Sequence, residues 1–254
     1  MEDTYHLNKR IEEISLNGWP ALQTVLYDGW LLRVSEGYTK RSNSVNPIYG
    51  HSMPLGDKIA YCERFYREKG MDSVFKITPF SHPENLDGRL EELGYRKAEH
   101  VLVQTLELDS LPSPVHAEAE FSDQAGDIWL RQLAELKVLS ATQLETKRKL
   151  FSGQPLNQCF ASLKVDGKPV AFGNIVLEDG WAGLSDIMTD PHYRGRGYGL
   201  SLTLHLLNWA KQSGASKAYL LVVDDNSAAL SLYSKLSFQT VYEYWYRVKS
   251  VASQ

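Results

Sequence analysis

Cysteine is the scarcest chemically reactive residue in this 254-residue sequence. Cys62 and Cys159 are the only two, they lie in different halves of the chain, and neither belongs to a Cys-x-x-Cys pair. This scarcity excludes a disulfide framework and a cysteine-based metal site. No other metal-ligand spacing is visible, so we expect no metal ion.

Long apolar runs are also missing. The N-terminus begins with acidic residues rather than an apolar signal segment, and no later stretch has the roughly 20 apolar residues that cross a bilayer. We therefore expect a soluble, cytoplasmic protein with no membrane partner.

Positive charge is not in excess. The 27 Lys and Arg residues face 31 Asp and Glu residues, which gives a net charge of −4. A protein that wraps nucleic acid needs clustered basic residues to displace counterions. The one tight basic run, Lys147, Arg148 and Lys149, is typical of a solvated helix face. We predict no nucleic-acid partner.

What the sequence does contain is typical of a globular protein with one large domain or two small ones. It is 43% hydrophobic and 11% aromatic. The segment 109–114 holds two Pro and two Ser directly after a long alternating strand pattern, which indicates a linker. We predict two domains, residues 1–112 and 113–254.

Strand-like and helix-like segments alternate along both parts. In the first part, strand patterns cover 29–34, 40–45, 74–77 and 95–108, and helical patterns cover 7–15, 56–69 and 83–93. In the second part, helices are expected at 128–137, 141–151, 197–213 and 227–236, and strands at 158–165, 169–178, 181–189, 217–223 and 238–248. The alternation predicts an α/β fold with a mixed sheet flanked by helices.

The strongest local signal is a glycine-rich turn between a predicted strand and the helix that follows it. Gly195, Gly197 and Gly199 alternate with bulkier residues, so consecutive backbone N–H groups can converge on an anion at the positive end of a helix. Arg194 and Arg196 add charge to a turn that would otherwise be read as a plain strand-to-helix connection. The spacing fits neither the dinucleotide fingerprint nor the P-loop, which disfavours a protein that binds ATP here.

Residues 194–199 resemble the R/Q-x-x-G-x-G/A signature of the GNAT superfamily, the acyl-CoA-dependent N-acetyltransferases. Residues 226–238 resemble the family's N-x-x-A-x-x-x-Y-x-x-x-G-F element, and only Ser237, where glycine is usual, departs from it. The two motifs stand in the family's order, about thirty residues apart, with a strand between them. The resemblance covers residues 115–248 and implies a GNAT domain there.

The resemblance also implies roles for single residues. Five backbone amides would hold the pyrophosphate of coenzyme A, those of Arg196, Gly197, Tyr198, Gly199 and Leu200. Met188 and Thr189 would pair with pantetheine like a neighbouring strand, and Arg194 and Arg196 would add charge. Asn226 would contact the pantetheine arm. Tyr233 would stand near the coenzyme sulfur as the general acid that protonates the leaving thiolate.

The general base is a separate question. Asp186 is the acid within the apolar strand that precedes the turn, and an acid in such a strand needs a reason. We interpret it as the base that accepts the amine proton. The alternatives are a structural hydrogen bond, for example to Ser185, or proton removal by another acid or by water.

The first domain resembles a degenerate copy of the second. A shift of 143 or 144 positions places 90–95 on 233–238, 74–77 on 217–220 and 47–49 on 191–193. The functional positions do not survive, because Pro83 stands for Asn226, Leu90 stands for Tyr233, and residues 50–55 replace the arginine-glycine turn. We predict a GNAT-like domain without a coenzyme site, with chance similarity of two α/β segments as the alternative.

These inferences converge on an N-acetyltransferase that transfers an acetyl or other acyl group from acetyl-CoA to a primary amine by direct attack. The alternative is a non-catalytic module that binds coenzyme A as a sensor or scaffold. The amine acceptor, a small molecule or a peptide, has no readable signature in the sequence. The chain is expected to be a monomer or a homodimer.

Overall fold

The computed structural model describes residues 2–50, 52–116 and 118–253, so Met1, His51, Ala117 and Gln254 lie outside the described residues. The chain forms two compact units. Unit 1 consists of Met1–Gly18 and Val103–Val241, and unit 2 consists of Trp19–Leu102 and Tyr242–Gln254. The expected division into residues 1–112 and 113–254 stays a prediction. In the structure, the N-terminal segment 1–18 belongs to the same compact unit as 103–241, and the C-terminal segment 242–254 belongs to the same unit as 19–102.

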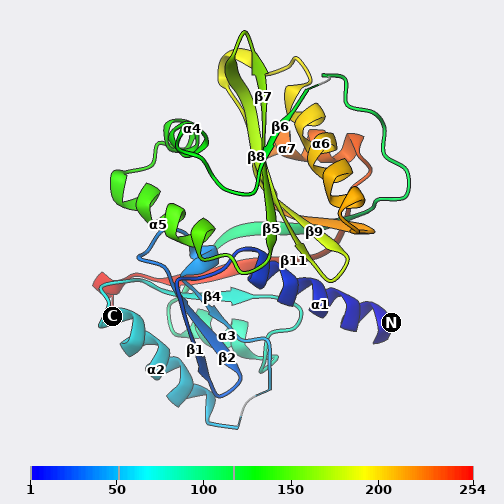
Figure 1. Ribbon diagram of the computed structural model, residues 1–254. Coiled ribbons are helices and arrows are strands. Elements are labelled where there is room, and N and C mark those ends of the chain that lie inside the picture. Colours follow the sequence, from blue (N-terminus) through cyan, green and yellow to red (C-terminus); the bar gives the residue numbers. More distant parts are fainter. Residues whose placement is uncertain (1, 51, 117, 254) are drawn as a thin grey trace. The chain divides into compact units, whose positions relative to one another are not determined.

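Unit 1 combines a mixed sheet with helices on both faces. Its elements are α1 (Glu2–Gly18), β6 (Glu120–Ser122), α4 (Asp127–Lys137), α5 (Ala141–Ser152), β7 (Asn157–Val165), β8 (Lys168–Glu178), β9 (Trp181–Thr189), the 3₁₀ turn η2 (Pro191–Tyr193), α6 (Tyr198–Gln212), β10 (Lys217–Val223) and α7 (Ser227–Lys235). The strand order is β10-β9-β8-β7-β6, and only β9 and β10 are parallel. Figure 1 shows α4 and α5 on one side of the β7–β8 ribbon and α6 on the other.

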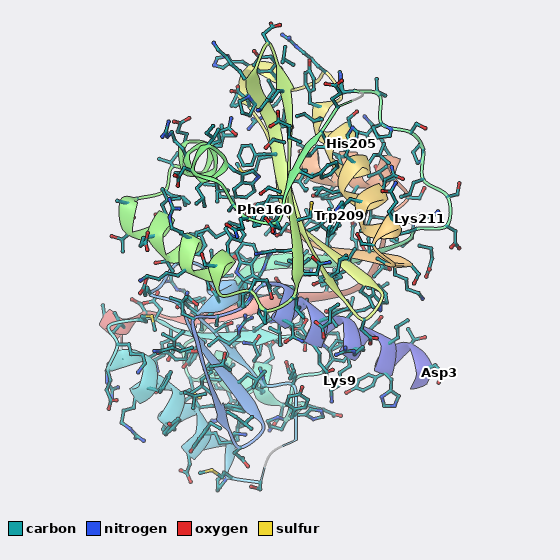
Figure 2. All side chains as sticks on the ribbon, in the orientation of Figure 1. Asp3, Lys9, Phe160, His205, Trp209 and Lys211 are labelled. Carbon is teal, nitrogen blue, oxygen red and sulfur yellow. The ribbon has the colours of Figure 1, made fainter. Side chains whose placement is uncertain are left out.

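The core under α4 and α5 is aromatic. Trp129 makes edge-to-face contacts with Phe151, Phe160 and Phe172, with ring centroids 5.1–5.4 Å apart. Figure 2 labels Phe160 on β7, within this cluster. Such pairs add to the hydrophobic gain from burying large rings. The cluster fixes α4 and α5 onto the sheet, and Met188 near the end of β9 packs against it.

Unit 2 is built on a similar plan with shorter elements. They are β1 (Gln23–Tyr27), β2 (Trp30–Val34), the 3₁₀ turn η1 (Lys40–Ser42), β3 (Val45–Asn46), α2 (Leu55–Arg67), β4 (Ser73–Ile77), α3 (Leu86–Glu92) and the 3₁₀ turn η3 (Val251–Ser253). The strands β5 (Arg96–Glu107) and β11 (Gln239–Lys249) each contain a boundary between the units. The Tyr242–Gln254 segment brings β11 beside β4, where Trp245 pairs with Ile77.

The two units repeat one pattern of strand directions. In unit 2 the order β1-β2-β3-β4 has two antiparallel pairs followed by one parallel pair, and β7-β8-β9-β10 in unit 1 has the same sequence of directions. In both units a helix, α2 or α6, joins the two parallel strands. The predicted mixed α/β fold of two GNAT-like parts is confirmed.

Membrane-spanning segments can be checked directly over the described ranges. No helix within them is long and apolar enough to cross a bilayer.

Candidate active site

The parallel strands β9 and β10 separate toward their carboxyl ends. Their pairing covers only Trp181–Gly183 against Lys217–Tyr219. The rest of β9, up to Thr189, and the rest of β10, up to Val223, are not paired with each other. Ligands of open α/β sheets bind outside the carboxyl ends of parallel strands. The separation therefore leaves strand edges that are not paired with each other, where an extended ligand can insert.

The predicted glycine-rich turn lies directly after β9. Gly195 and Gly197 have φ values of +75° and +84°, a left-handed conformation that glycine adopts without strain. The backbone N–H groups of residues 195–200 donate no hydrogen bond within the described residues, and the first bond of the helix runs from Ser201 N to Gly197 O, 3.0 Å. Unpaired amides at a helix N-terminus form a binding site for phosphate.

The two sequence motifs meet at Gly199. A Cβ atom built on this glycine would lie 3.1 Å from both Thr189 Oγ1 and Leu232 Cδ1. Leu232 directly precedes Tyr233 on α7, and Thr189 ends β9. The turn, the strand end and α7 therefore pack against one another at a position where a side chain would fit only if its neighbours shifted by a few tenths of an ångström.

The two arginines of the turn differ in their contacts. Arg194 Nε donates to Thr189 O at 3.3 Å, and the Arg196 guanidinium lies over the Tyr193 ring at 5.5 Å. Both side chains are exposed. Of the two strand-end residues predicted to pair with pantetheine, Thr189 already accepts the bond from Arg194 at its carbonyl, and Met188 lies opposite Phe172 of β8.

A histidine that sequence reasoning missed lies at the turn. The His116 ring stacks on Tyr198 with centroids 4.1 Å apart, and its Nε2 is 3.0 Å from Arg196 O. His116 N donates to Ser201 Oγ at 3.0 Å, and His116 O is 2.8 Å from Nε2 of His205. Figure 2 labels His205 on α6. The segment before β6 is thereby fixed to the first turns of α6. No local pattern signals this contact, because 80 residues separate His116 from Arg196.

We expect His116→Ala to weaken coenzyme binding. The substitution removes the stack on Tyr198 and the contact with the Arg196 carbonyl, so the Arg196–Gly197 peptide loses a partner that holds it in place. One lost hydrogen bond of about 1 kcal/mol corresponds to roughly a fivefold rise in Kd. Titration calorimetry with acetyl-CoA measures it, with His192→Ala, an exposed residue of the same turn, as the control.

Asn226 and Tyr233 occupy the start and the middle of α7. Asn226 Oδ1 caps the helix by accepting from Ala229 N at 3.1 Å, while its amide group is exposed. The Tyr233 side chain is buried with its ring 5.6 Å from that of Phe238. Burial raises the pKa of Tyr233 to about 12, which keeps the hydroxyl protonated at neutral pH. That is the protonation state a general acid needs.

Asp186 lies in a bulge of β9 with φ 51°, opposite Gly173. Its side chain is 1% exposed, and its two oxygens pair with Lys137 and Lys147, the latter at 2.9 Å. Despite the opposing effect of burial, these two lysines hold the pKa of Asp186 well below its usual range. A carboxylate with two cationic partners accepts a proton poorly. The environment differs from the one that the predicted general base requires, and Ser185 bonds to Asn174 instead.

The basic run 147–149 is not the solvated helix face that the sequence predicted. The Lys147 side chain is 2% exposed, and its ammonium group lies 4.0 Å from the centroid of the Phe151 ring as well as beside Asp186. Only Arg148 and Lys149 face outward. A run of three like charges cannot reveal this, because the buried partner, Asp186, comes from a distant strand.

We expect Asp186→Asn to destabilise the fold. The change leaves Lys147 buried without its carboxylate, and because Lys137 is one-third exposed we expect a loss of about 2 kcal/mol, below the range for a fully buried pair. The folded pKa of Asp186 is depressed, so its contribution is present above about pH 4 and is lost as the pH falls further. Urea unfolding at pH 7 and pH 3 measures both effects.

Asp127→Asn is the matched control. Its carboxylate is 79% exposed and also pairs with a basic residue, Arg148, at 3.0 Å. An exposed pair contributes little, so the free energy of unfolding should barely change at either pH. Equal losses for the two variants would contradict the interpretation of Asp186.

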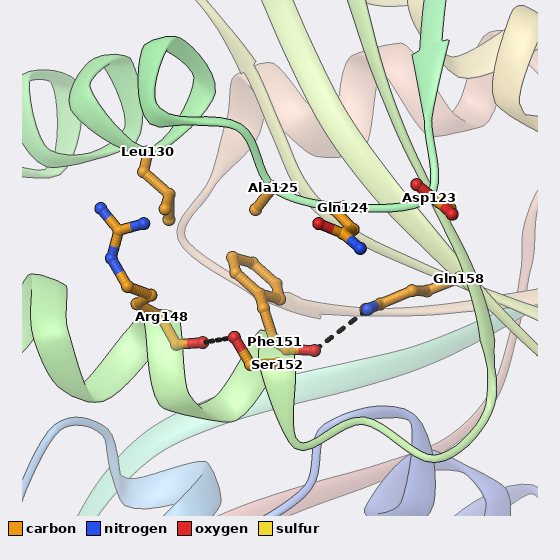
Figure 3. A pocket seen from close by; sticks show the side chains of 8 residues that line it. All are labelled: Asp123, Gln124, Ala125, Leu130, Arg148, Phe151, Ser152 and Gln158. Carbon is orange, nitrogen blue, oxygen red and sulfur yellow. Dashed lines mark hydrogen bonds between the residues drawn. The ribbon is translucent and has the colours of Figure 1, made fainter.

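A separate cavity of about 380 Å³ lies in unit 1 between the β6–α4 connection, α5 and the start of β7. Figure 3 shows Phe151 at its centre, with Arg148 and Leu130 on one side and Gln158 on the other. Its full lining is Asp123, Gln124, Ala125, Leu130, Arg148, Phe151, Ser152 and Gln158. None of the residues predicted to bind coenzyme A contributes to it.

Solved structures share this fold. A GCN5-related N-acetyltransferase from Kribbella flavida has a TM-score of 0.68 at 15% identity and covers 95% of each chain. A tandem GNAT protein from the clavulanic acid biosynthesis pathway has a TM-score of 0.62 at 13% identity and covers 76% of this chain and 68% of its own. This shared fold, together with the family model and the sequence relative reported in the next paragraph, makes the chain a GNAT-superfamily protein and an acyl-CoA-dependent acetyltransferase.

The particular family follows from the sequence comparison. The family model "Probable histone acetyltransferase Rv0428c C-terminal" matches residues 8–247, and the chain belongs to this family. An uncharacterized N-acetyltransferase of Bacillus subtilis (strain 168), YobR, is 31% identical over 245 residues, which cover 95% of this chain and 98% of that protein. The match extends over both units.

Proposed function

We propose that this chain transfers an acetyl group from acetyl-CoA to a primary amine by direct attack. The observation that carries the proposal is the row of unpaired amides at residues 195–200, which lies beside the separated ends of β9 and β10. Phosphate groups and an extended arm are the chemistry that these two features fit. The exposed Arg194 and Arg196 supply positive charge at the same place.

The residues present fit coenzyme A as the acyl carrier. The amides of Arg196, Gly197, Tyr198, Gly199 and Leu200 would hold its pyrophosphate. Met188 and Thr189 at the end of β9 would pair with the pantetheine arm, and the exposed Asn226 would contact it from the next strand end. The coenzyme supplies an activated thioester carbonyl and a thiol leaving group. No three His, Cys, Asp or Glu side chains cluster as metal ligands among the described residues.

We assign the general-acid role to Tyr233, because it stands at the tyrosine position of the N-x-x-A-x-x-x-Y element on α7, and its raised pKa keeps the hydroxyl protonated at neutral pH. Tyr233 would donate its hydroxyl proton to the leaving sulfur and would then be reprotonated from solvent. Asp186 would hold Lys137 and Lys147 in place rather than remove a proton, because both lysines already neutralise it. The acceptor amine would then lose its proton to water, so kcat/KM should rise with pH toward the pKa of that amine.

Two measurements test the proposed function. Titration calorimetry with acetyl-CoA should show binding, and release of free thiol should depend on an added primary amine. Absence of binding at millimolar acetyl-CoA with the protein folded would refute the proposal. Binding without amine-dependent thiol release would favour the alternative of a coenzyme A sensor or scaffold.

A further inference from the structure

In unit 2 a carboxylate from the β1–β2 turn accepts hydrogen bonds from the backbone amides just before the N-terminus of α2. The two Asp28 oxygens accept from Ser52 N, at 3.0 Å each, and from Ser52 Oγ at 2.7 Å. Asp28 Oδ2 also accepts from Met53 N at 3.0 Å. The backbone amides just before α2 therefore already hold an anion, and that anion belongs to the chain itself.

A buried cation completes this cluster. The Lys58 side chain is fully buried, and its ammonium group lies 3.1 Å from Asp28 Oδ2 and 2.6 Å from Asp28 O. The same group sits 3.9 Å from the centroid of the Trp30 ring. Burial lowers the pKa of Lys58, whereas the amides and the hydroxyl of Ser52 hold that of Asp28 below its usual range. A buried ammonium without a counter-ion is strongly destabilising, so an anion is required at this place.

The cluster occupies the position that corresponds to the glycine-rich turn of unit 1. The helix α2 follows β3 as α6 follows β9, and in both units the helix joins a pair of parallel strands. A shift of 144 positions places residues 52–55 on residues 196–199. The partners of Asp28 are therefore the counterparts of the amides that would hold the pyrophosphate.

Hairpin length explains why a carboxylate reaches this position only in unit 2. Both hairpins turn on an Asp-Gly pair with positive φ, Asp28–Gly29 at 42° and 82° and Asp166–Gly167 at 51° and 75°. The strands β1 and β2 have 5 residues each, whereas β7 and β8 have 9 and 11. The short hairpin ends at the loop before α2, where a Cβ on Gly29 would meet Gly50 O at 1.9 Å. The longer hairpin carries Asp166 outward, where it is exposed.

We propose that Asp28 is a built-in anion that fills, in unit 2, the place of the coenzyme phosphates in unit 1. The chain consequently binds one coenzyme, and the turn before α2 is a phosphate-type anion site that opens only when the Asp28 carboxylate is removed. The number of coenzymes rests on the proposed function of unit 1. The anion site of unit 2 is tested independently of it.

The test is anion rescue of Asp28→Gly in the full-length chain. Glycine accepts the positive φ of this position, so the variant removes the carboxylate without straining the backbone. We expect Tm to fall by about 5 °C or more. Sodium formate or phosphate at tens of millimolar should recover about half of that loss, because an anion that binds only the folded state stabilises it. Chloride at equal ionic strength should not.

Asp166→Gly is the matched control, because it removes an exposed carboxylate from the equivalent turn. Its Tm should change little, and formate should act on it no more than chloride does. Equal rescue of Asp28→Gly by chloride and by formate, or no rescue by any anion, would overturn the proposal. These outcomes do not depend on whether unit 1 binds acetyl-CoA.

A second pair of variants covers the case in which Asp28→Gly does not fold. Asp28→Asn leaves the Lys58 ammonium group buried without its counter-ion. Adding Lys58→Met removes this buried charge. We expect the double variant to have the higher Tm of the two. A double variant that is less stable than Asp28→Asn alone would contradict the role of Asp28 as the counter-ion.

The stoichiometry of binding is measured on the wild-type chain. Titration should give one acetyl-CoA per chain, and two bound coenzymes would contradict the proposal that Asp28 fills the anion site of unit 2.

Discussion

Gly197→Val weakens the binding of acetyl-CoA by about a hundredfold or more, if the turn holds the pyrophosphate as proposed. Gly197 has φ +84°, which a β-branched residue adopts only under strain, so the turn must change its backbone conformation. The amides on either side then no longer point to one place. Loss of one or two hydrogen bonds to a charged group corresponds to about 3 kcal/mol, or about two powers of ten in Kd. Titration calorimetry measures the change.

The control for this variant lies at the other end of the same helix. Gly214 follows α6 with φ +96°, and a Cβ there would meet no atom within 4 Å. Gly214→Val therefore introduces similar backbone strain without touching the glycine-rich turn. It should lower the free energy of unfolding by a comparable amount and leave the Kd of acetyl-CoA unchanged. A similar loss of affinity in both variants would show that strain, not the anion site, is responsible.

Tyr233→Phe should lower kcat by about a hundredfold while the Kd of acetyl-CoA stays within a few-fold of wild type. The ring and its contact with Phe238 are retained, so only the hydroxyl is lost. Because the pKa of Tyr233 is raised to about 12, the wild-type hydroxyl stays protonated across the usual assay range. The pH dependence of kcat should therefore show no loss of activity from Tyr233 below that pH. Steady-state kinetics with a primary amine measures both.

Tyr219→Phe provides the comparison for Tyr233. Its hydroxyl is buried and donates to Ile14 O at 3.1 Å, away from the turn. Removing it should reduce the free energy of unfolding by about 1 kcal/mol and leave kcat intact. A Tyr233→Phe enzyme with wild-type kcat would exclude the hydroxyl as the general acid.

Most elements were predictable because their signals are local. The apolar periodicity and the Asp-Gly turns gave α6, β8 and β9 nearly at their observed bounds. The strand predicted at 40–45 was largely wrong, because only Val45–Asn46 is extended and Lys40–Ser42 forms a 3₁₀ turn. The Asn43 side chain explains the difference, since its Oδ1 accepts from Ser35 N at 2.6 Å and its Nδ2 donates to Thr39 O at 2.8 Å. Such side-chain bonds to the backbone compete with strand pairing.

Short edge strands escaped prediction for a related reason. β6 has only 3 residues, all exposed, and β1 has 5 of which four are exposed. Neither shows the alternation of apolar and polar residues that marks a half-buried strand. Their place is set by their neighbours, through the pairing of Phe121 with Ala161 and of Val25 with Leu32.

The candidate site also contains parts that local sequence patterns predict and parts that only long-range contacts define. The turn and the Asn226–Phe238 element are continuous stretches, so their spacing was readable before any fold was known. The two motifs lie close together at Gly199, where strand, turn and α7 pack together. The His116 contact was not readable, because it joins the turn to a segment that has no motif of its own.

The class of chemistry and the glycine-rich turn could be read from the amino-acid sequence alone, because glycine spacing and helix starts depend on neighbouring residues. Which charged side chains are free to act became visible in the folded chain. Asp186 is neutralised by Lys137 and Lys147, and Asp28 is held by Lys58 and the amides before α2. Burial and pairing depend on which side chains the fold brings together from distant elements, and those set the charge state and the use of each carboxylate.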